Sequence, residues 1–105
     1  MPKVTIRLTE SAVADLEELK RWYSEQDVAD IGDRLVAEIF KRIETLRNHP
    51  DMGRVVPEFA QQYLRELIHA PFRIVYRREA KVVRVVRVWR SERLLHLPLG
   101  ADDQK

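Results

Sequence analysis

The strongest constraint on the fold is the stretch KVVRVVRVWRSERLL, residues 81–95. Six of the eight residues from 82 to 89 are β-branched or aromatic, which is typical of a strand. Arginine recurs at every third position, and this spacing matches neither the 3.6-residue period of a helix nor the two-residue period of a strand. Two interpretations follow: a basic stripe that binds nucleic acid, or a core strand whose arginines have separate roles.

The pleat of a strand argues against a continuous basic stripe, because successive side chains point to opposite faces. Strict alternation places Arg84 and Arg90 on one face and places Arg87, with Trp89, on the other. If the strand ends near Trp89, Arg90 and Arg93 lie beyond it and leave the sheet together. We therefore predict a central strand whose binding residues lie at its end.

Two amphipathic helices are predicted in the first half of the chain. Apolar residues recur at helical spacing from about residue 9 to residue 26, and again in a segment that reaches about residue 47. Thr9 is the expected cap of the first helix, and Asp27 or Asp30 that of the second. Because the turn between the two helices is short, they are expected to form a helical hairpin.

The remaining segments predict strands. Residues 3–8 and 72–77 alternate with a two-residue period, and residues 63–68 are a further candidate strand. Residues 78–81 suit a hairpin connection to the last strand, and Pro57 indicates an extended loop after the second helix. The order β-α-α-β-β-β predicts an α+β fold, in which a small, mostly antiparallel sheet carries a helical hairpin on one face.

The length of 105 residues suits one domain, predicted over residues 1–97, with a flexible C-terminal tail at 98–105. The sequence contains no cysteine and no apolar stretch long enough for a membrane span, so we expect a cytoplasmic protein without a direct membrane role. Residues 63–97 hold nine basic and three acidic residues. This excess indicates either an anionic partner or arginines along the rim of an ordinary sheet.

Motifs of common enzyme classes are missing from the sequence. No nucleotide-binding glycine loop or zinc-protease motif occurs, and the three histidines are not at metal-ligand spacing. We therefore expect no metal and no cofactor. A metal-free ribonuclease stays possible by residue type, because arginines and a tyrosine on adjacent strands would suit the charge that develops at phosphorus. The candidates are Arg73, Tyr76, Arg77 and Arg90.

Three blocks of the sequence carry a family resemblance, and they read LTESAVADLEELKRWY, LVAEIFKRIETLRNHPDMGRVVPEF and LRELIHAPFRIVYRREAKVVRVVRVWRSERLL. They resemble the RelE/ParE superfamily of toxins from bacterial type II toxin–antitoxin modules, and are closer to its ParE-like branch. Together they cover about residues 4–95. The β-α-α-β-β-β order also matches the fold that this resemblance implies.

The RelE-like branch implies a ribosome-dependent mRNA endoribonuclease, and this chain departs from that pattern. The lysines of the branch fall near Leu64 and Glu66, and its tyrosine falls near Leu97. Its central arginine is matched by Arg73, the sole catalytic candidate if the protein is a ribonuclease. Arg73 also has a structural interpretation, as the partner of an acid such as Glu66.

The ParE-like branch implies a toxin of the plasmid-stabilisation type that is not an enzyme, inhibits DNA gyrase by binding, and meets nucleic acid only indirectly. A cognate antitoxin would neutralise it in a hetero-oligomer. The expected target-binding residues are Trp89, Arg90 and Arg93. The expected antitoxin-binding residues are Leu94, Leu95 and Leu97. Two alternatives remain: the RelE-like ribonuclease, and a non-toxic binding module.

Overall fold

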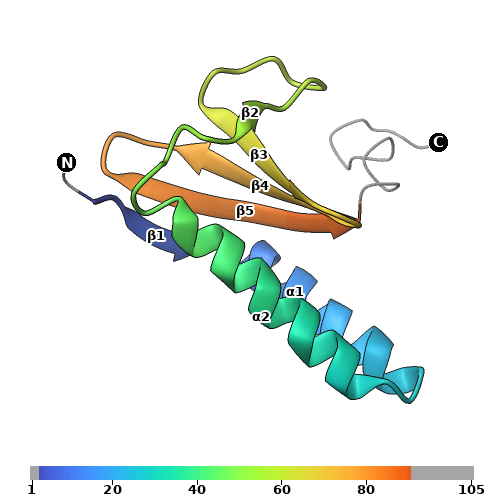
Figure 1. Ribbon diagram of the computed structural model, residues 1–105. Helices are drawn as coiled ribbons and strands as arrows, with labels where there is room; N and C mark the ends of the chain where they lie inside the picture. Colours follow the sequence, from blue (N-terminus) through green and yellow to red (C-terminus); the bar gives the residue numbers. More distant parts are fainter. Residues whose placement is uncertain (1–2, 91–105) are drawn as a thin grey trace.

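The structure is a computed structural model that describes residues 3–90, and this part contains five strands and two helices (Figure 1). The predicted α+β class and the predicted element order are confirmed. One short strand was missed, because it lies in the segment predicted as an extended loop. In chain order the elements are β1 (Thr5–Leu8), α1 (Glu10–Glu25), α2 (Ala29–Thr45), β2 (Arg54–Val55), β3 (Leu64–His69), β4 (Phe72–Arg78) and β5 (Val82–Arg90).

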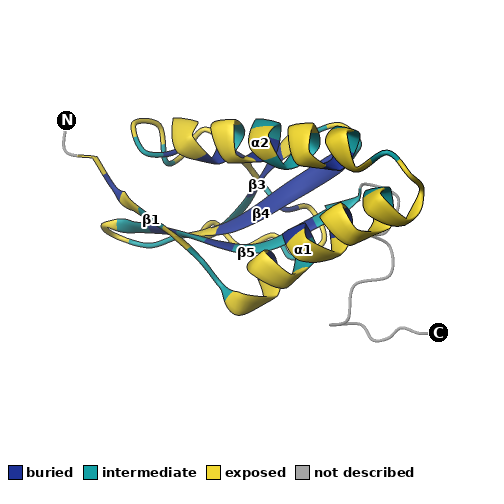
Figure 2. Ribbon diagram, turned by 90° about the horizontal axis from the view of Figure 1, so that it is seen from below, coloured by how far each residue is buried: buried dark blue, intermediate teal, exposed yellow. Residues whose placement is uncertain are grey.

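The five strands form one mixed sheet in the order β1-β5-β4-β3-β2. β1 runs parallel to β5, and the other neighbouring strands are antiparallel. Both helices cover one face of the sheet, because their apolar residues form one core cluster with the inward residues of β3, β4 and β5. The outer surfaces of the helices are exposed, and β4 is largely buried (Figure 2). β5, predicted to be central, lies inside the sheet between β1 and β4.

The core lies between the helical hairpin and the sheet. Apolar residues on one face of each helix meet the inward side chains of β3, β4 and β5, and together they exclude water. The largest side chains that are less than 2% exposed include Tyr76, Ile39, Ile43, Leu46, Ile74, Val83 and Val85.

The two helices begin differently. Thr9 caps α1 as predicted, because its side-chain oxygen accepts a hydrogen bond from the N–H of Ala12 at 3.1 Å. α2 starts after Val28 without a side-chain cap, so the predicted caps Asp27 and Asp30 were wrong. Asp27 lies in the connecting turn with a φ of 63°, and Asp30 lies inside the first helical turn, where its charge favours the helix N-terminus.

Tyr76 fastens the loop after α2 to the sheet. Its buried hydroxyl donates to the carbonyl of Pro50 at 2.8 Å and accepts from the N–H of Gly53 at 3.0 Å. Burial raises the pKa of this hydroxyl. A Cβ at Gly53 would lie 2.7 Å from the Tyr76 hydroxyl and from a backbone oxygen, so this close approach requires glycine.

A bulge interrupts the pairing of β4 with β5. Val75 lies opposite Arg87, whereas the next residue of β4, Tyr76, lies opposite Val85. Val86 is therefore an extra residue in β5, and every residue after it is displaced by one position from strict alternation.

The bulge overturns the predicted distribution of the arginines. Residues that lie opposite one another in adjacent strands share a face. Arg84 and Arg87 lie opposite Arg77 and Val75, so both occupy the face away from the helices. Arg90 lies opposite Phe72, on the helix-covered face. The prediction that Arg84 and Arg90 share a face was wrong, because it assumed an unbroken pleat.

Candidate functional site

A groove with a volume of about 410 Å³ opens where β5 ends beside α1. Four aromatic side chains line it, from α1 and from the adjoining ends of β4 and β5. They are Trp22, Tyr23, Phe72 and Trp89. Asp15, Glu18, Leu19, Val88 and Arg90 complete the lining. The groove therefore combines a broad aromatic surface with charges of both signs at its margin.

Trp22 is one of the groove residues that the sequence did not identify as a binding residue. In the sequence it is simply one of the apolar residues of the first predicted helix. In the structure it is 49% exposed and makes an edge-to-face contact with Tyr23, with the ring centroids 4.9 Å apart. Half-exposed tryptophans in a concave site are typical anchors for a protein partner.

Trp89 and Arg90, two of the expected target-binding residues, both line the groove. The guanidinium of Arg87 lies 4.7 Å from the centroid of the Trp89 ring, and that of Arg90 lies 5.5 Å from the centroid of Phe72. Such cation–π contacts favour a fixed orientation of the aromatic ring. Two of the four rings are thus held by arginines.

The groove exists because α1 replaces β1 along the outer edge of β5. The pairing of β1 with β5 ends at Leu8 and Val85. Beyond this point, the carboxylate of Asp15 accepts a hydrogen bond from the N–H of Val88 at 2.8 Å and pairs with Arg87 at 2.8 and 2.9 Å. Helix α1 therefore supplies a hydrogen-bond acceptor to the edge of β5 that β1 leaves unpaired, and it forms one wall of the groove.

The other expected binding residues, Arg93, Leu94, Leu95 and Leu97, lie outside the described residues. The same holds for the predicted tail at 98–105.

Arg73, the ribonuclease candidate, lies in a buried charge network on the face of the sheet away from the helices. Its side chain is only 9% exposed, and its Nε donates to Glu66 at 2.5 Å. Its two terminal nitrogens donate to Glu58 at 3.1 and 3.0 Å. Glu66 is fully buried and also accepts from Arg54 at 2.6 Å. The predicted pairing of Arg73 with Glu66 is confirmed.

This network leaves the guanidinium of Arg73 no spare hydrogen-bonding face for a phosphate. Glu66, one of the positions where the RelE-like pattern has a lysine, places a carboxylate against Arg73 instead of a second positive charge. Stabilisation of a phosphorane-like transition state needs unpaired positive groups at this point. At Arg73, the described residues therefore place a locally balanced charge rather than an unpaired positive group.

A metal site is not found among residues 3–90, which contain no group of three or more histidine, cysteine or acidic residues that could hold an ion. In the same part of the chain, neither helix is long and apolar enough to cross a membrane.

Comparison with solved structures shows the same fold in two toxin–antitoxin systems. The first is the chromosomal ParDE system from P. aeruginosa, with a TM-score of 0.71, 21% identity, and coverage of 84% of this chain and 96% of that chain. The second is the RelBE2 complex from Mycobacterium tuberculosis, with a TM-score of 0.63, 19% identity, and coverage of 84% and 98%.

Comparison with family models gives a match over residues 6–95 to the family described as "ParE toxin of type II toxin-antitoxin system, parDE". A search of curated proteins found no match. The family match covers both helices and all five strands almost completely, including every residue of the aromatic groove. The chain therefore belongs to the ParE toxin family of type II toxin–antitoxin systems.

Proposed function

We propose that this toxin inhibits DNA gyrase by binding to it, and that a cognate antitoxin neutralises it by covering the aromatic groove. The observation that carries the proposal is the aromatic groove, whose lining includes Trp22, Trp89 and Arg90. Arg73, by contrast, is enclosed by Glu58 and Glu66. An aromatic groove with a charged margin suits a protein partner better than a phosphodiester substrate.

Family membership supports the antitoxin, because both similar structures come from toxin–antitoxin systems. A groove bounded by a helix suits an apolar segment of a partner, laid against exposed rings. The antitoxin is expected to be small and acidic near Arg90, and to be encoded beside the toxin.

Such a module on a plasmid would favour cells that keep the plasmid. Action on gyrase places the toxin in the cytoplasm.

Gyrase inhibition is tested with the purified protein in supercoiling and gyrase-dependent DNA cleavage assays, run beside a ribosome-dependent mRNA cleavage assay. We expect inhibition of supercoiling, its weakening in Trp89→Ala and Arg90→Ala, and its relief by the antitoxin. Arg84→Ala is the matched control, because Arg84 lies on β5 outside the groove.

Two outcomes would overturn this proposal. Unchanged gyrase activity together with mRNA cuts that disappear in Arg73→Ala would identify a ribonuclease. Normal growth of cells that express the protein without any partner, with no effect in either assay, would identify a non-toxic binding module.

A further inference from the structure

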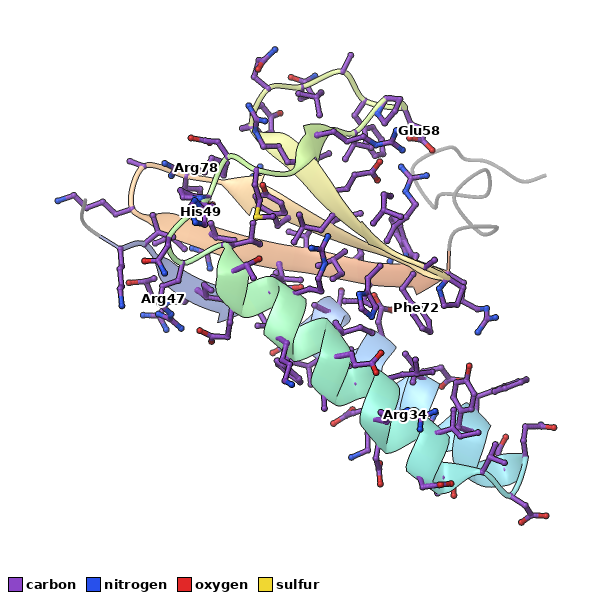
Figure 3. All side chains as sticks on the ribbon, viewed as in Figure 1. Arg34, Arg47, His49, Glu58, Phe72 and Arg78 are labelled. Carbon is purple, nitrogen blue, oxygen red and sulfur yellow. The ribbon has the colours of Figure 1, made fainter. Side chains whose placement is uncertain are left out.

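A second hollow, of about 700 Å³, lies at the opposite end of the sheet from the aromatic groove. It is bounded by the start of β1, the loop after α2 and the hairpin between β4 and β5. Its basic lining residues are Lys3, His49, Arg78 and Lys81. Figure 3 shows His49 and Arg78 together at this end of the sheet, with Phe72 at the other end.

Backbone hydrogen bonds fix the segments that carry these residues. The N–H of Thr5 donates to the carbonyl of Lys81 at 2.9 Å, and the N–H of Val4 donates to the carbonyl of Arg47 at 3.2 Å. The start of β1 is thereby tied both to the hairpin and to the end of α2. The backbones that carry Lys3 and Lys81 are therefore held side by side rather than brought together by chance.

The hollow has an excess of positive charge. Asp51 is its one acidic residue among the described lining, and Arg78 neutralises it across 2.9 Å. Arg78 also donates to the carbonyls of Glu79 and Ala80, so it shapes the hairpin turn. No ion pair within residues 3–90 engages Lys3 or Lys81. Lys3 is attracted to Glu44 only at longer range, so neither ammonium group is held in a direct ion pair within the described residues.

The chemistry of the lining selects the kind of anion. Lysine ammonium groups bind phosphates as hydrated point charges, without the planar fork with which arginine matches carboxylates and phosphates. The described lining contains no Phe, Tyr or Trp that would anchor a protein partner or stack on an unpaired base. Contacts of this kind position a nucleic acid through its backbone and carry no sequence information.

We propose that this hollow binds the phosphate backbone of duplex DNA, without sequence preference, through Lys3 and Lys81. This contact goes beyond inhibition of gyrase, because it is a direct interaction of the toxin with DNA and does not depend on which enzyme the toxin inhibits. The sequence-based expectation that nucleic acid is met only indirectly would then be wrong.

The test is the fluorescence anisotropy of a labelled random-sequence duplex, titrated with the full-length toxin at several salt concentrations. Two phosphate contacts predict that affinity falls roughly tenfold between about 50 and 200 mM salt. Lys3→Ala/Lys81→Ala is expected to abolish most of this salt dependence. The matched control is Lys20→Ala/Lys41→Ala, which removes the same charge from exposed positions on the two helices.

Equal weakening by the two double variants would overturn the proposal, because net charge rather than a site would then explain the binding. A salt dependence that survives in Lys3→Ala/Lys81→Ala would also overturn it. So would tighter binding of poly-glutamate than of the duplex, since the hollow would then be a site for an acidic polypeptide. Thermal unfolding of both variants verifies that the fold is retained.

Discussion

Two regions of the sheet contain an arginine beside acidic or aromatic side chains: the buried network of Arg73 and the aromatic groove with Arg90. They differ in the groups that interact with the guanidinium. In the buried network, the charges of Arg73 and Glu66 are satisfied inside the protein. In the groove, Arg90 lies over the buried ring of Phe72, and the lining also includes the half-exposed Trp22. The same residue type thus serves stability in one region and lines a candidate recognition surface in the other.

The comparison shows why arginine content alone is a poor guide to function. Internal ion pairs occupy Arg54, Arg73, Arg84 and Arg87, all on the open face of the sheet or at its edge. These residues raise the basic count of the C-terminal third, but their charges are balanced locally. A partner therefore meets a much less basic face than the sequence indicates.

The largest effect is expected from breaking the buried network. Arg73→Ala leaves the buried carboxylate of Glu66 with Arg54 as its remaining partner, and should lower the free energy of unfolding by about 3–5 kcal/mol. Denaturant unfolding measures this loss. Replacement of both partners, Glu66→Leu with Arg73→Met, should recover much of it, because no unpaired charge remains buried. A loss of less than about 1 kcal/mol in Arg73→Ala would show that water already reaches the network.

Substitutions in the aromatic groove are expected to weaken binding of the antitoxin rather than to lower stability. Trp22→Ala removes a half-exposed anchor of the groove and should weaken antitoxin binding by at least about 2 kcal/mol, or roughly 30-fold in Kd. Its thermal stability should change little. Isothermal titration calorimetry with the antitoxin measures the loss. Phe40→Ala is the matched control, because Phe40 is 42% exposed on α2 and does not line the groove. Equal losses in both variants would argue against the groove as the docking site.

The buried hydroxyl of Tyr76 allows its contribution to stability to be tested by changing the pH. Because its pKa is raised in the folded state, the folded protein keeps this proton more tightly than the unfolded chain does. The resulting stability is complete below a pH of about 10 and is lost as the pH rises towards the raised pKa.

Tyr76→Phe should cost about 1–3 kcal/mol at neutral pH, because the N–H of Gly53 and the carbonyl of Pro50 lose their partner. Its stability should fall less steeply above pH 10 than that of the wild type. Urea unfolding between pH 8 and 11 measures both effects, with the exposed Tyr63→Phe as control. Parallel pH profiles for the wild type and Tyr76→Phe would contradict this assignment.

The smallest effect is expected at Arg84. Its ion pair with Glu79 is about one-third exposed on both sides, and the hydrogen bond from Arg84 lowers the pKa of the Glu79 carboxyl. Exposed pairs of this kind contribute little, because solvent screens them. Arg84→Ala should leave the unfolding midpoint within experimental error, and a large shift would show that this pair contributes more than an exposed ion pair.

Local patterns predicted much of this fold. The cap at Thr9, the two helices and the alternation of β4 all follow from short-range spacing. Sequence patterns failed to predict features that depend on contacts between distant segments of the chain. The bulge at Val86 depends on how β5 pairs with β4, and the exposure of Trp22 depends on where α1 crosses β5. The turn before α2 is closed by backbone hydrogen bonds instead of an aspartate cap.

The bulge at Val86 takes up one extra residue of β5, so that Arg87, Trp89 and Arg90 still meet their partners in β4. Loss of Val86 would restore strict alternation and leave these partners unchanged, so Trp89 and Arg90 would keep their faces of the sheet. A relative that is one residue shorter between Arg84 and Trp89 would thus keep both the fold and the binding surface. Pairing with β4, rather than the length of β5, therefore sets which side chains face a partner.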